Sequence, residues 1–182
     1  MRENQSPSLQ IALNPNSALE YVLPVKIRQT TTATSGTTVY AFRNSVSSTK
    51  TVYLKAINLA LDFDGATSLT TKYYDLCRFS GATPSGGTSL TVIKAQTSDD
   101  TSNVTDARYL DTGLTTTNVT FESAFHTIGI SINKPNGSQP IVFNNGQIPN
   151  ISLAPGEGFA IRTNGTTSIG LGLFGSIAWV EK

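Results

Sequence analysis

The sequence predicts an all-β domain, an antiparallel sandwich or barrel, with an extended arm at its amino terminus. From Tyr21 onward, short runs of alternating apolar residues are separated by residues that form tight turns. No long run shows the apolar spacing of an amphipathic helix. A chain of 182 residues is also long enough for one domain with its own hydrophobic core.

The composition argues against a nucleic-acid-binding module, an internal disulfide and a metal site with several histidines. Charged residues make up 14% of the chain, the formal net charge is +1, and serine and threonine together account for about a quarter of the residues. This surface of hydroxyl and amide groups lacks the clustered lysine and arginine of a nucleic-acid-binding module, so we expect no nucleic-acid partner. The single cysteine excludes an internal disulfide, and the single histidine excludes a metal site built from several imidazoles.

Neither of the segments that direct a chain to a membrane is expected. The first residues lack the apolar run of a secretory signal. The longest apolar stretch, Ile169 to Val180, is interrupted by glycines and is too short to span a bilayer. We therefore expect no membrane partner.

Residues 1–20 are predicted to form the extended arm. They are polar, contain Pro7 and Pro15, and show no helical periodicity. Leu9, Ile11 and Leu13 alternate with other residues, so one face of a short extended segment is apolar and suited to pairing with a sheet edge. That edge would belong either to the same subunit or to a neighbour, and a terminus without fixed structure is the alternative.

The first strands of the domain are predicted at Val39–Phe42 and Thr51–Phe63. In the second of these, both alternating faces are largely apolar, which is typical of a strand in the middle of a two-layer stack. One face would carry Tyr53, Lys55, Ile57, Leu59 and Leu61, and the other would carry Val52, Leu54, Ala56 and Asn58.

The middle of the chain predicts further strands. Tyr73–Phe79 and Leu90–Ala95 would pair through a glycine-rich turn at Ser80–Gly87. One short helical turn is expected around Thr97–Ala107. Val119–Phe125 and Thr127–Ile132 follow as the next two strands.

The last two strands carry the strongest pattern. Phe159 and Ile161 alternate with other residues before an Asn-Gly pair at residues 164–165, which suits a type I′ hairpin turn. Beyond that turn, alternate residues from Ile169 to Trp179 share one apolar face. The opposite face begins with small residues, so we expect another layer or another subunit to approach it closely. The predicted contact residues on that face are Gly170, Gly172, Phe174 and Val180.

The residues with reactive side chains do not form a recognisable catalytic motif. His126 lies in a predicted strand, and a buried strand position would raise the pKa of Cys77. The acidic runs Asp62–Gly65 and Asp99-Asp100 contain oxygen ligands for calcium, but Asp-Gly at a strand end is ordinary turn chemistry. We expect a protein that is not an enzyme and has no cofactor, with bound calcium left open.

Two stretches carry a resemblance to a known class of protein. The first is Tyr73–Thr88, with an aromatic-Arg-aromatic strand and a Gly-Gly-Thr turn, continuing through Leu90–Lys94. The second is Leu153–Ile161, with a Pro-Gly-Glu-Gly hairpin, followed by the terminal Ile177–Glu181 with its tryptophan. Together they cover about a third of the chain. They are similar to small structural proteins of tailed-bacteriophage virions, including capsid decoration, or cement, proteins.

This resemblance implies a jelly-roll sandwich and a role on the virion. Such a protein is made in the host bacterial cytoplasm, assembles onto the capsid exterior, commonly as a homotrimer, and has the major capsid protein as its partner. It would bridge neighbouring capsid subunits, with Leu9, Ile11 and Leu13 as one contact.

Other functions stay open. A receptor- or glycan-binding domain of a phage tail fibre or spike would also be a compact β-sandwich, with threonine, asparagine and aromatic residues on exposed loops. A cellular carbohydrate-binding module would place exposed aromatic residues on one sheet, and Tyr73, Tyr74 and Tyr109 are the candidates. A phage enzyme is the third alternative.

Overall fold

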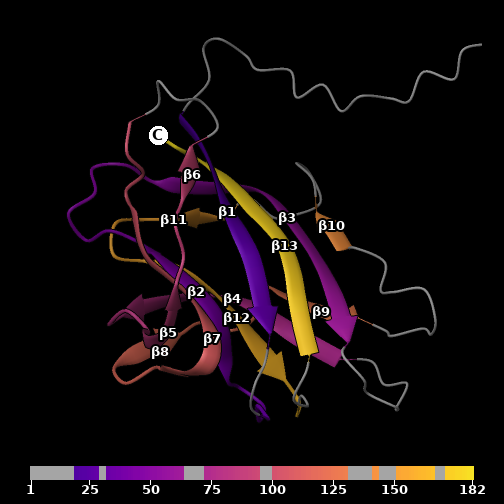
Figure 1. The fold of residues 1–182 in the computed structure, drawn as a ribbon. Coiled ribbons are helices and arrows are strands. Elements are labelled where there is room, and N and C mark those ends of the chain that lie inside the picture. Colours follow the sequence, from indigo (N-terminus) through magenta and orange to yellow (C-terminus); the bar gives the residue numbers. More distant parts are fainter. Residues whose placement is uncertain are drawn as a thin grey trace, which may run out of the picture.

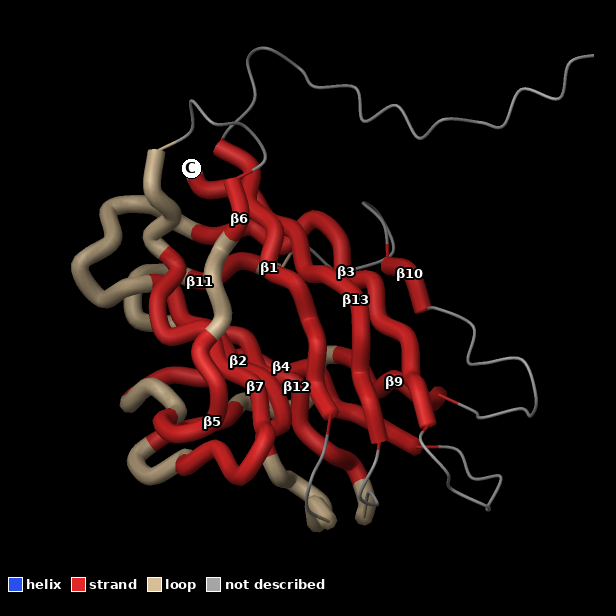
Figure 2. The backbone as a smooth tube through the Cα atoms, viewed as in Figure 1, coloured by secondary structure: helices blue, strands red, loops and turns tan. Residues whose placement is uncertain are grey.

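The computed structural model describes residues 19–28, 32–63, 72–94, 100–130, 141–143, 151–166 and 171–182. Within these ranges the chain forms thirteen β-strands and no helix (Figure 1, Figure 2). The strands form two sheets, and every pairing is antiparallel. The predicted fold class, an antiparallel two-sheet sandwich, is confirmed. No membrane-spanning helix occurs in the described part of the chain.

The first sheet has the order β10-β3-β13-β1-β6, with β11 also paired to β3. Its strands are β1 (Leu19–Arg28), β3 (Val52–Phe63), β6 (Ile93–Lys94), β10 (Ile141–Phe143), β11 (Ser152–Leu153) and β13 (Leu171–Glu181). The second sheet has the order β5-β7-β2-β12-β4-β8, with β9 also paired to β4. Its strands are β2 (Thr38–Asn44), β4 (Lys72–Gly81), β5 (Ser85–Ser89), β7 (Val104–Thr115), β8 (Val119–Phe121), β9 (His126–Ile130) and β12 (Gly158–Asn164).

The order of the strands is that of a jelly roll. The first four strands alternate between the sheets, and so do the last two: β1, β3 and β13 lie in the first sheet, and β2, β4 and β12 lie in the second. The sets β1-β13-β3-β10 and β2-β12-β4-β9 are the two four-stranded sheets of that architecture. Strands β5 and β7 extend the second sheet beyond β2, and β6 extends the first beyond β1. The jelly-roll expectation is therefore confirmed.

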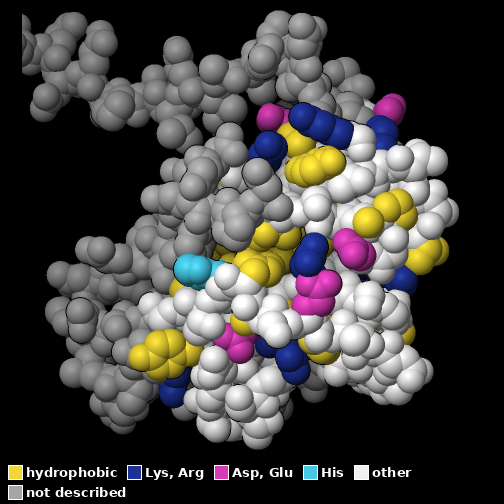
Figure 3. Space-filling model, turned by 180° about the vertical axis from the view of Figure 1, so that it is seen from behind, with side chains coloured by type: hydrophobic (Ala, Val, Ile, Leu, Met, Phe, Trp, Pro, Cys, Tyr) yellow, Lys and Arg dark blue, Asp and Glu magenta, His cyan; other side chains and the backbone are white. Residues whose placement is uncertain are grey.

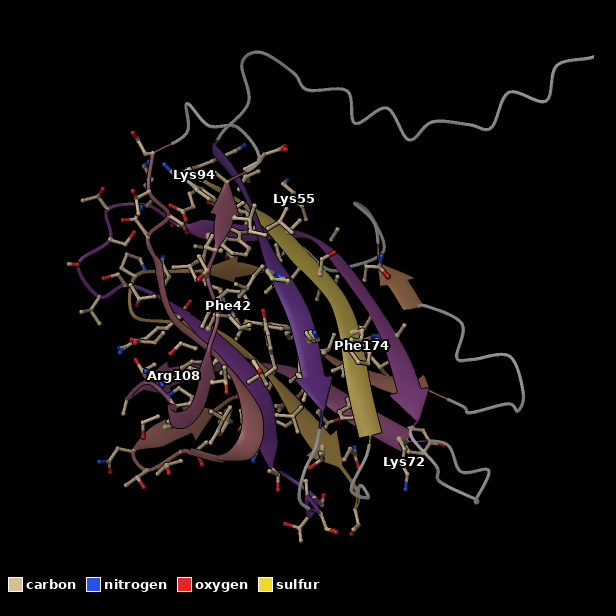
Figure 4. All side chains as sticks on the ribbon, in the orientation of Figure 1. Phe42, Lys55, Lys72, Lys94, Arg108 and Phe174 are labelled. Atoms are coloured by element: carbon tan, nitrogen blue, oxygen red, sulfur yellow. The ribbon has the colours of Figure 1, made fainter. Side chains whose placement is uncertain are left out.

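Large aromatic side chains from both sheets fill the space between the layers. Trp179 of β13 stacks on Tyr21 of β1 with ring centroids 5.9 Å apart, and on Phe42 of the opposite sheet at 5.4 Å. Phe42 also contacts Phe159, and Figure 4 shows it between the two layers. All four side chains are buried. Burial of each contributes about 1.5 to 3 kcal/mol to stability, so this cluster holds the sheets together.

Strand β3 carries a β-bulge that changes which residues face the core. Ala178 of β13 pairs with Ala56, whereas the next residue, Trp179, pairs with Leu54. The extra residue reverses the alternation of side chains. The core-facing residues of β3 are Val52, Leu54, Ile57 and Leu59. The predicted strict alternation along Thr51–Phe63 is therefore wrong at the bulge.

The glycine-rich segment after β4 is a strand where a turn was expected. Ser85–Ser89 forms β5 and pairs with β7. Gly87 has a φ of +63°, and a Cβ atom there would collide with the carbonyl oxygen of Tyr109. Glycine is therefore what allows β5 to approach its neighbour so closely. Since β6 pairs with β1, the expected hairpin between Tyr73–Phe79 and Leu90–Ala95 is also wrong.

The helical turn expected around Thr97–Ala107 is absent from the described part of that segment, where residues 100–103 form an irregular connection. Residues from Val104 onward belong to β7. Val104 and Ala107 are both buried although they lie three residues apart, a spacing that resembles a helix. The cause is an irregularity in the pairing with β2, where Asp106 adopts a φ of +53°. The bulge in β7 thus turns both side chains toward the core.

The sheet begins slightly before the predicted domain boundary at Tyr21. Leu19 pairs with Glu181, so residues 19 and 20, assigned to the arm, already belong to β1. The remainder of the predicted arm, with Leu9, Ile11 and Leu13, lies outside the described residues. Strand β12 ends at Asn164, and Gly165 has a φ of +108°. Because β12 lies in the second sheet and β13 in the first, the hairpin expected at residues 164–165 is wrong.

Candidate functional site

The outer face of the first sheet contains the predicted subunit interface. Leu173, Ile177 and Trp179 of β13 face the core, so the residues between them face outward. Of the predicted contacts, Gly172 and Val180 are buried within the single chain, and Phe174 is half-buried (Figure 4). Gly170 lies outside the described residues. Phe174 is thus the one described contact residue that offers apolar side-chain surface to a partner.

The neighbours of Phe174 on this face are mostly small or apolar, with Lys26 and Asn58 as the exceptions. In the strand register, Phe174 lies between Lys26 of β1 and Ala60 of β3. Two residues on, Ser176 lies between Pro24 and Asn58, and then Ala178 lies between Val22 and Ala56. Most of these side chains are half-buried, with Lys26 and Asn58 exposed. This part of the face combines small and apolar side chains with one exposed lysine, which suits a contact between subunits.

The outer face of the second sheet is covered by side chains of the same chain. A small buried cluster of Ala41, Cys77, Phe79 and Ala160 lies on this side, with Val119 and Phe121 packed against it. The guanidinium of Arg162 lies 4.1 Å from the centre of the Phe121 ring. It also donates from Nε and Nη2 to the carbonyl oxygen of Gly36. Figure 3, which views the molecule from behind, shows hydrophobic side chains near the middle of that face with basic and acidic ones beside them.

Cys77 has the properties of a structural residue. Its side chain is 1% exposed, and Sγ donates to the carbonyl oxygen of Ala160 at 3.8 Å. Burial raises the pKa of the thiol to about 11, although the nearby Arg162 opposes that shift. At neutral pH the thiol is therefore protonated and a poor nucleophile. His126 begins β9 and is exposed.

A buried carboxylate at the end of β13 was not singled out from the sequence. Glu181 is 2% exposed and accepts hydrogen bonds from the Ser102 hydroxyl and from the backbone and side-chain amides of Asn103. The indole Nε1 of Trp179 donates to it as well. These donors explain how a charge is tolerated there, and they fix the 102–103 segment against the last strand. The role of Glu181 is structural.

The three tyrosines considered for carbohydrate binding differ in exposure. Tyr73 of β4 is 47% exposed, whereas Tyr74 is 2% exposed and faces the core. Tyr109 is half-buried and packs against the core. Beside Tyr73, the Asp75 carboxylate accepts hydrogen bonds from the Thr127 hydroxyl and the Asn164 side-chain amide. An exposed ring therefore lies next to a set of oriented polar groups.

The acidic residues considered for calcium do not come together where they are described. Among described residues, no group of three His, Cys, Asp or Glu side chains could hold a metal ion. Asp100 is exposed and lies 3.9 Å from Lys50. Asp64 and Asp99 lie outside the described ranges.

Comparison of the chain with protein-family models, with curated proteins and with solved structures finds no match.

Proposed function

We propose that this protein is a non-enzymatic virion structural protein that decorates a bacteriophage capsid and stabilises it by bridging neighbouring capsid subunits. The observation that carries the proposal is the jelly-roll strand order, an architecture found in viral capsid proteins. Because one fold serves many functions, the phage assignment also depends on the resemblance of Tyr73–Thr88 and Leu153–Ile161 to virion proteins. These stretches contribute to β4, β5, β11 and β12.

Two surfaces would serve this function. The arm residues Leu9, Ile11 and Leu13 supply a contact to the major capsid protein, through strand pairing and burial of their apolar side chains. The outer face of the first sheet, around Phe174, supplies the contact between copies in a homotrimer. A rigid sandwich with low net charge suits a bridge, because it transmits force between capsid subunits without binding the packaged nucleic acid.

The experiment is to locate the protein on the particle. Purified protein is added to capsids that lack it, the particles are sedimented, and the occupied particles are imaged by cryo-electron microscopy. The expected result is saturable binding, with density for the sandwich on the capsid exterior above the seams between capsid subunits. Density at the tip of a tail fibre would instead support the receptor-binding alternative, and the absence of binding to any part of the particle would contradict a virion role.

A further inference from the structure

The surroundings of Tyr73 on the outer face of the second sheet leave its ring accessible. Its neighbour Tyr74 faces the core, so Tyr73 faces outward and is 47% exposed. In the strand register, Tyr73 lies between Gly129 of β9 and Asn164 of β12. Because Gly129 has no side chain, no neighbouring group covers the ring from β9 at that position.

Polar groups beside the ring are held in fixed positions. Asp75 lies two residues along β4 and on the same face as Tyr73. Its Oδ1 accepts a hydrogen bond of 2.6 Å from Thr127 Oγ1 and one of 3.0 Å from Asn164 Nδ2. Two side chains, one from each strand beside β4, are thereby oriented around one carboxylate.

Among the described residues, the Asp75 carboxylate forms no ion pair. Arg162 pairs with Asp75 in the register, yet its guanidinium donates to the carbonyl oxygen of Gly36 and lies over the ring of Phe121. Among the described residues, Asp75 therefore interacts with neutral donors only. A negatively charged acceptor is left at the surface, where it can attract hydroxyl hydrogens.

The remaining hydrogen-bonding capacity favours a ligand rich in hydroxyl groups. Both bonds to Asp75 reach Oδ1, so Oδ2 keeps its capacity to accept. The Thr127 hydroxyl has donated its hydrogen and offers lone pairs, and Asn164 offers a carbonyl oxygen and a second amide hydrogen. A pyranose sugar has the complementary form, because its hydroxyls donate from the edge while its C–H groups present an apolar face to an aromatic ring.

We propose that Tyr73, Asp75, Thr127 and Asn164 form a binding site for a hexopyranose of the glucose or galactose type. The C–H face of the sugar stacks on Tyr73, and adjacent hydroxyls donate to Asp75. The inference does not depend on the capsid location proposed above, since the site lies on the second sheet and the proposed trimer contact lies on the first.

The test uses the full chain and two probes, cellotetraose for the glucose type and lactose for the galactose type. Saturation-transfer NMR is expected to show transfer to the ring C–H hydrogens of at least one of them, and none to sorbitol, which has hydroxyls but no ring. Calorimetric titration then compares variants. Tyr73→Phe keeps the stacking surface and binds within about threefold of the wild type, whereas Tyr73→Ala and Asp75→Ala each lose about tenfold or more.

A matched variant separates the site from general effects on the fold. Ile93→Ala removes an apolar side chain of similar exposure, 54%, from the first sheet, and it is expected to bind the sugar as the wild type does. Thermal unfolding of every variant checks that the sandwich is intact. The proposal is overturned if neither sugar receives saturation from the wild type, or if Tyr73→Ala binds as tightly as Ile93→Ala. Failure of sugar binding alongside normal attachment to capsids would leave the proposed function standing.

Discussion

The ring of Phe79 lies over Gly158 and fills the space that a side chain at position 158 would need. The carbonyl oxygen of Phe42 limits the same space from β2, only 2.6 Å from where a Cβ atom would lie. Gly158 begins β12 and pairs with Phe79 on one side and Arg43 on the other. The glycine that ends the Pro-Gly-Glu-Gly turn is therefore required by packing across three strands.

We expect Gly158→Ala to lower the free energy of unfolding by about 1 to 3 kcal/mol, because the new methyl group must displace the Phe79 ring or the β2 backbone. Urea denaturation followed by tryptophan fluorescence measures the change. The double variant with Phe79→Leu is the control: relief of the clash should make its loss of stability smaller than the sum of the two single losses. Strictly additive losses would show that Phe79 and Gly158 do not compete for space.

The fold class could be predicted because turn chemistry and alternation are local signals. The turn expected at Pro155 to Gly158 forms, with Gly156 at a φ of +87° and the Glu157 carboxylate accepting from the backbone amide of Ala154. It connects β11 of the first sheet to β12 of the second, so the hairpin expected there is wrong. The bulge in β3 opposite Ala178 could not be predicted, since it is defined by how two strands far apart in the sequence pair. For the same reason β5 could not be predicted. Its glycines are typical of a turn, and only the pairing with β7, which is distant in the sequence, makes the segment a strand.

The candidate sites also combine features that are local in the sequence with features that depend on strand pairing. Tyr73 and Tyr74 are adjacent in the sequence, and only the placement of β4 decides which one faces the core. The partners of Asp75, on β9 and β12, lie 52 and 89 residues away in the chain. Sequence analysis could therefore name the tyrosines as candidates. The polar groups beside Tyr73 could be identified only from the arrangement of the strands in the sheet.

Alkaline pH should destabilise the protein, in part through Cys77. Burial raises the pKa of its thiol from an ordinary 9.0 to about 11, and burial also raises the pKa of Tyr40 and Tyr74 above 10.0. Between about pH 9 and pH 11 the unfolded chain releases the thiol proton that the folded chain retains. The contribution of the thiol to the free energy of unfolding is therefore fully present below pH 9 and decreases as the pH rises through this range.

The measurement is the free energy of unfolding from urea titrations at pH 8, 9 and 10. In Cys77→Ala the decline between pH 9 and 10 should be shallower than in the wild type, because the tyrosine contributions alone remain. Identical declines in the two proteins would contradict a thiol that is buried and neutral in the folded state.

The outer face of the first sheet should support a homotrimer. Sedimentation equilibrium is expected to give three times the 19.3-kDa chain mass at micromolar concentration. Phe174→Arg places a charge among Ala60, Pro24 and Ser176 and should shift the protein toward monomer, with its unfolding temperature checked separately. Val46→Arg, at a loop residue 68% exposed, is the matched control and should remain trimeric. If the wild type is a monomer at high micromolar concentration, the proposed trimer interface around Phe174 is contradicted.

The arm should contribute to capsid attachment without being needed for the fold. Deletion of residues 1–18 leaves β1 complete, because that strand begins at Leu19, so the unfolding temperature should change little. Occupancy on capsids should fall, since each apolar side chain buried against the partner contributes about 1.5 to 3 kcal/mol before the cost of ordering the arm.

A companion variant keeps the arm at full length and replaces Leu9, Ile11 and Leu13 by serine. It should lose occupancy as the deletion does, if the apolar side chains are the contact. Equal occupancy of the deletion variant and the wild type would place the capsid contact on the sandwich. A deletion variant that fails to fold would mean that the arm is part of the domain.

The pairing of β1 with β13 has a mechanical consequence. All ten residues of β1 are paired with β13, from Leu19 opposite Glu181 to Arg28 opposite Gly172. A pull applied at Leu19 along the strand axis, with the sandwich held in place, would strain the hydrogen bonds of this ladder together, in shear. A pull between Leu19 and Glu181 would instead open the same ladder one pair at a time, from a single end, at much lower force. Tension that enters through the arm of a protein anchored by its sheet face is thus carried in the stronger of the two directions.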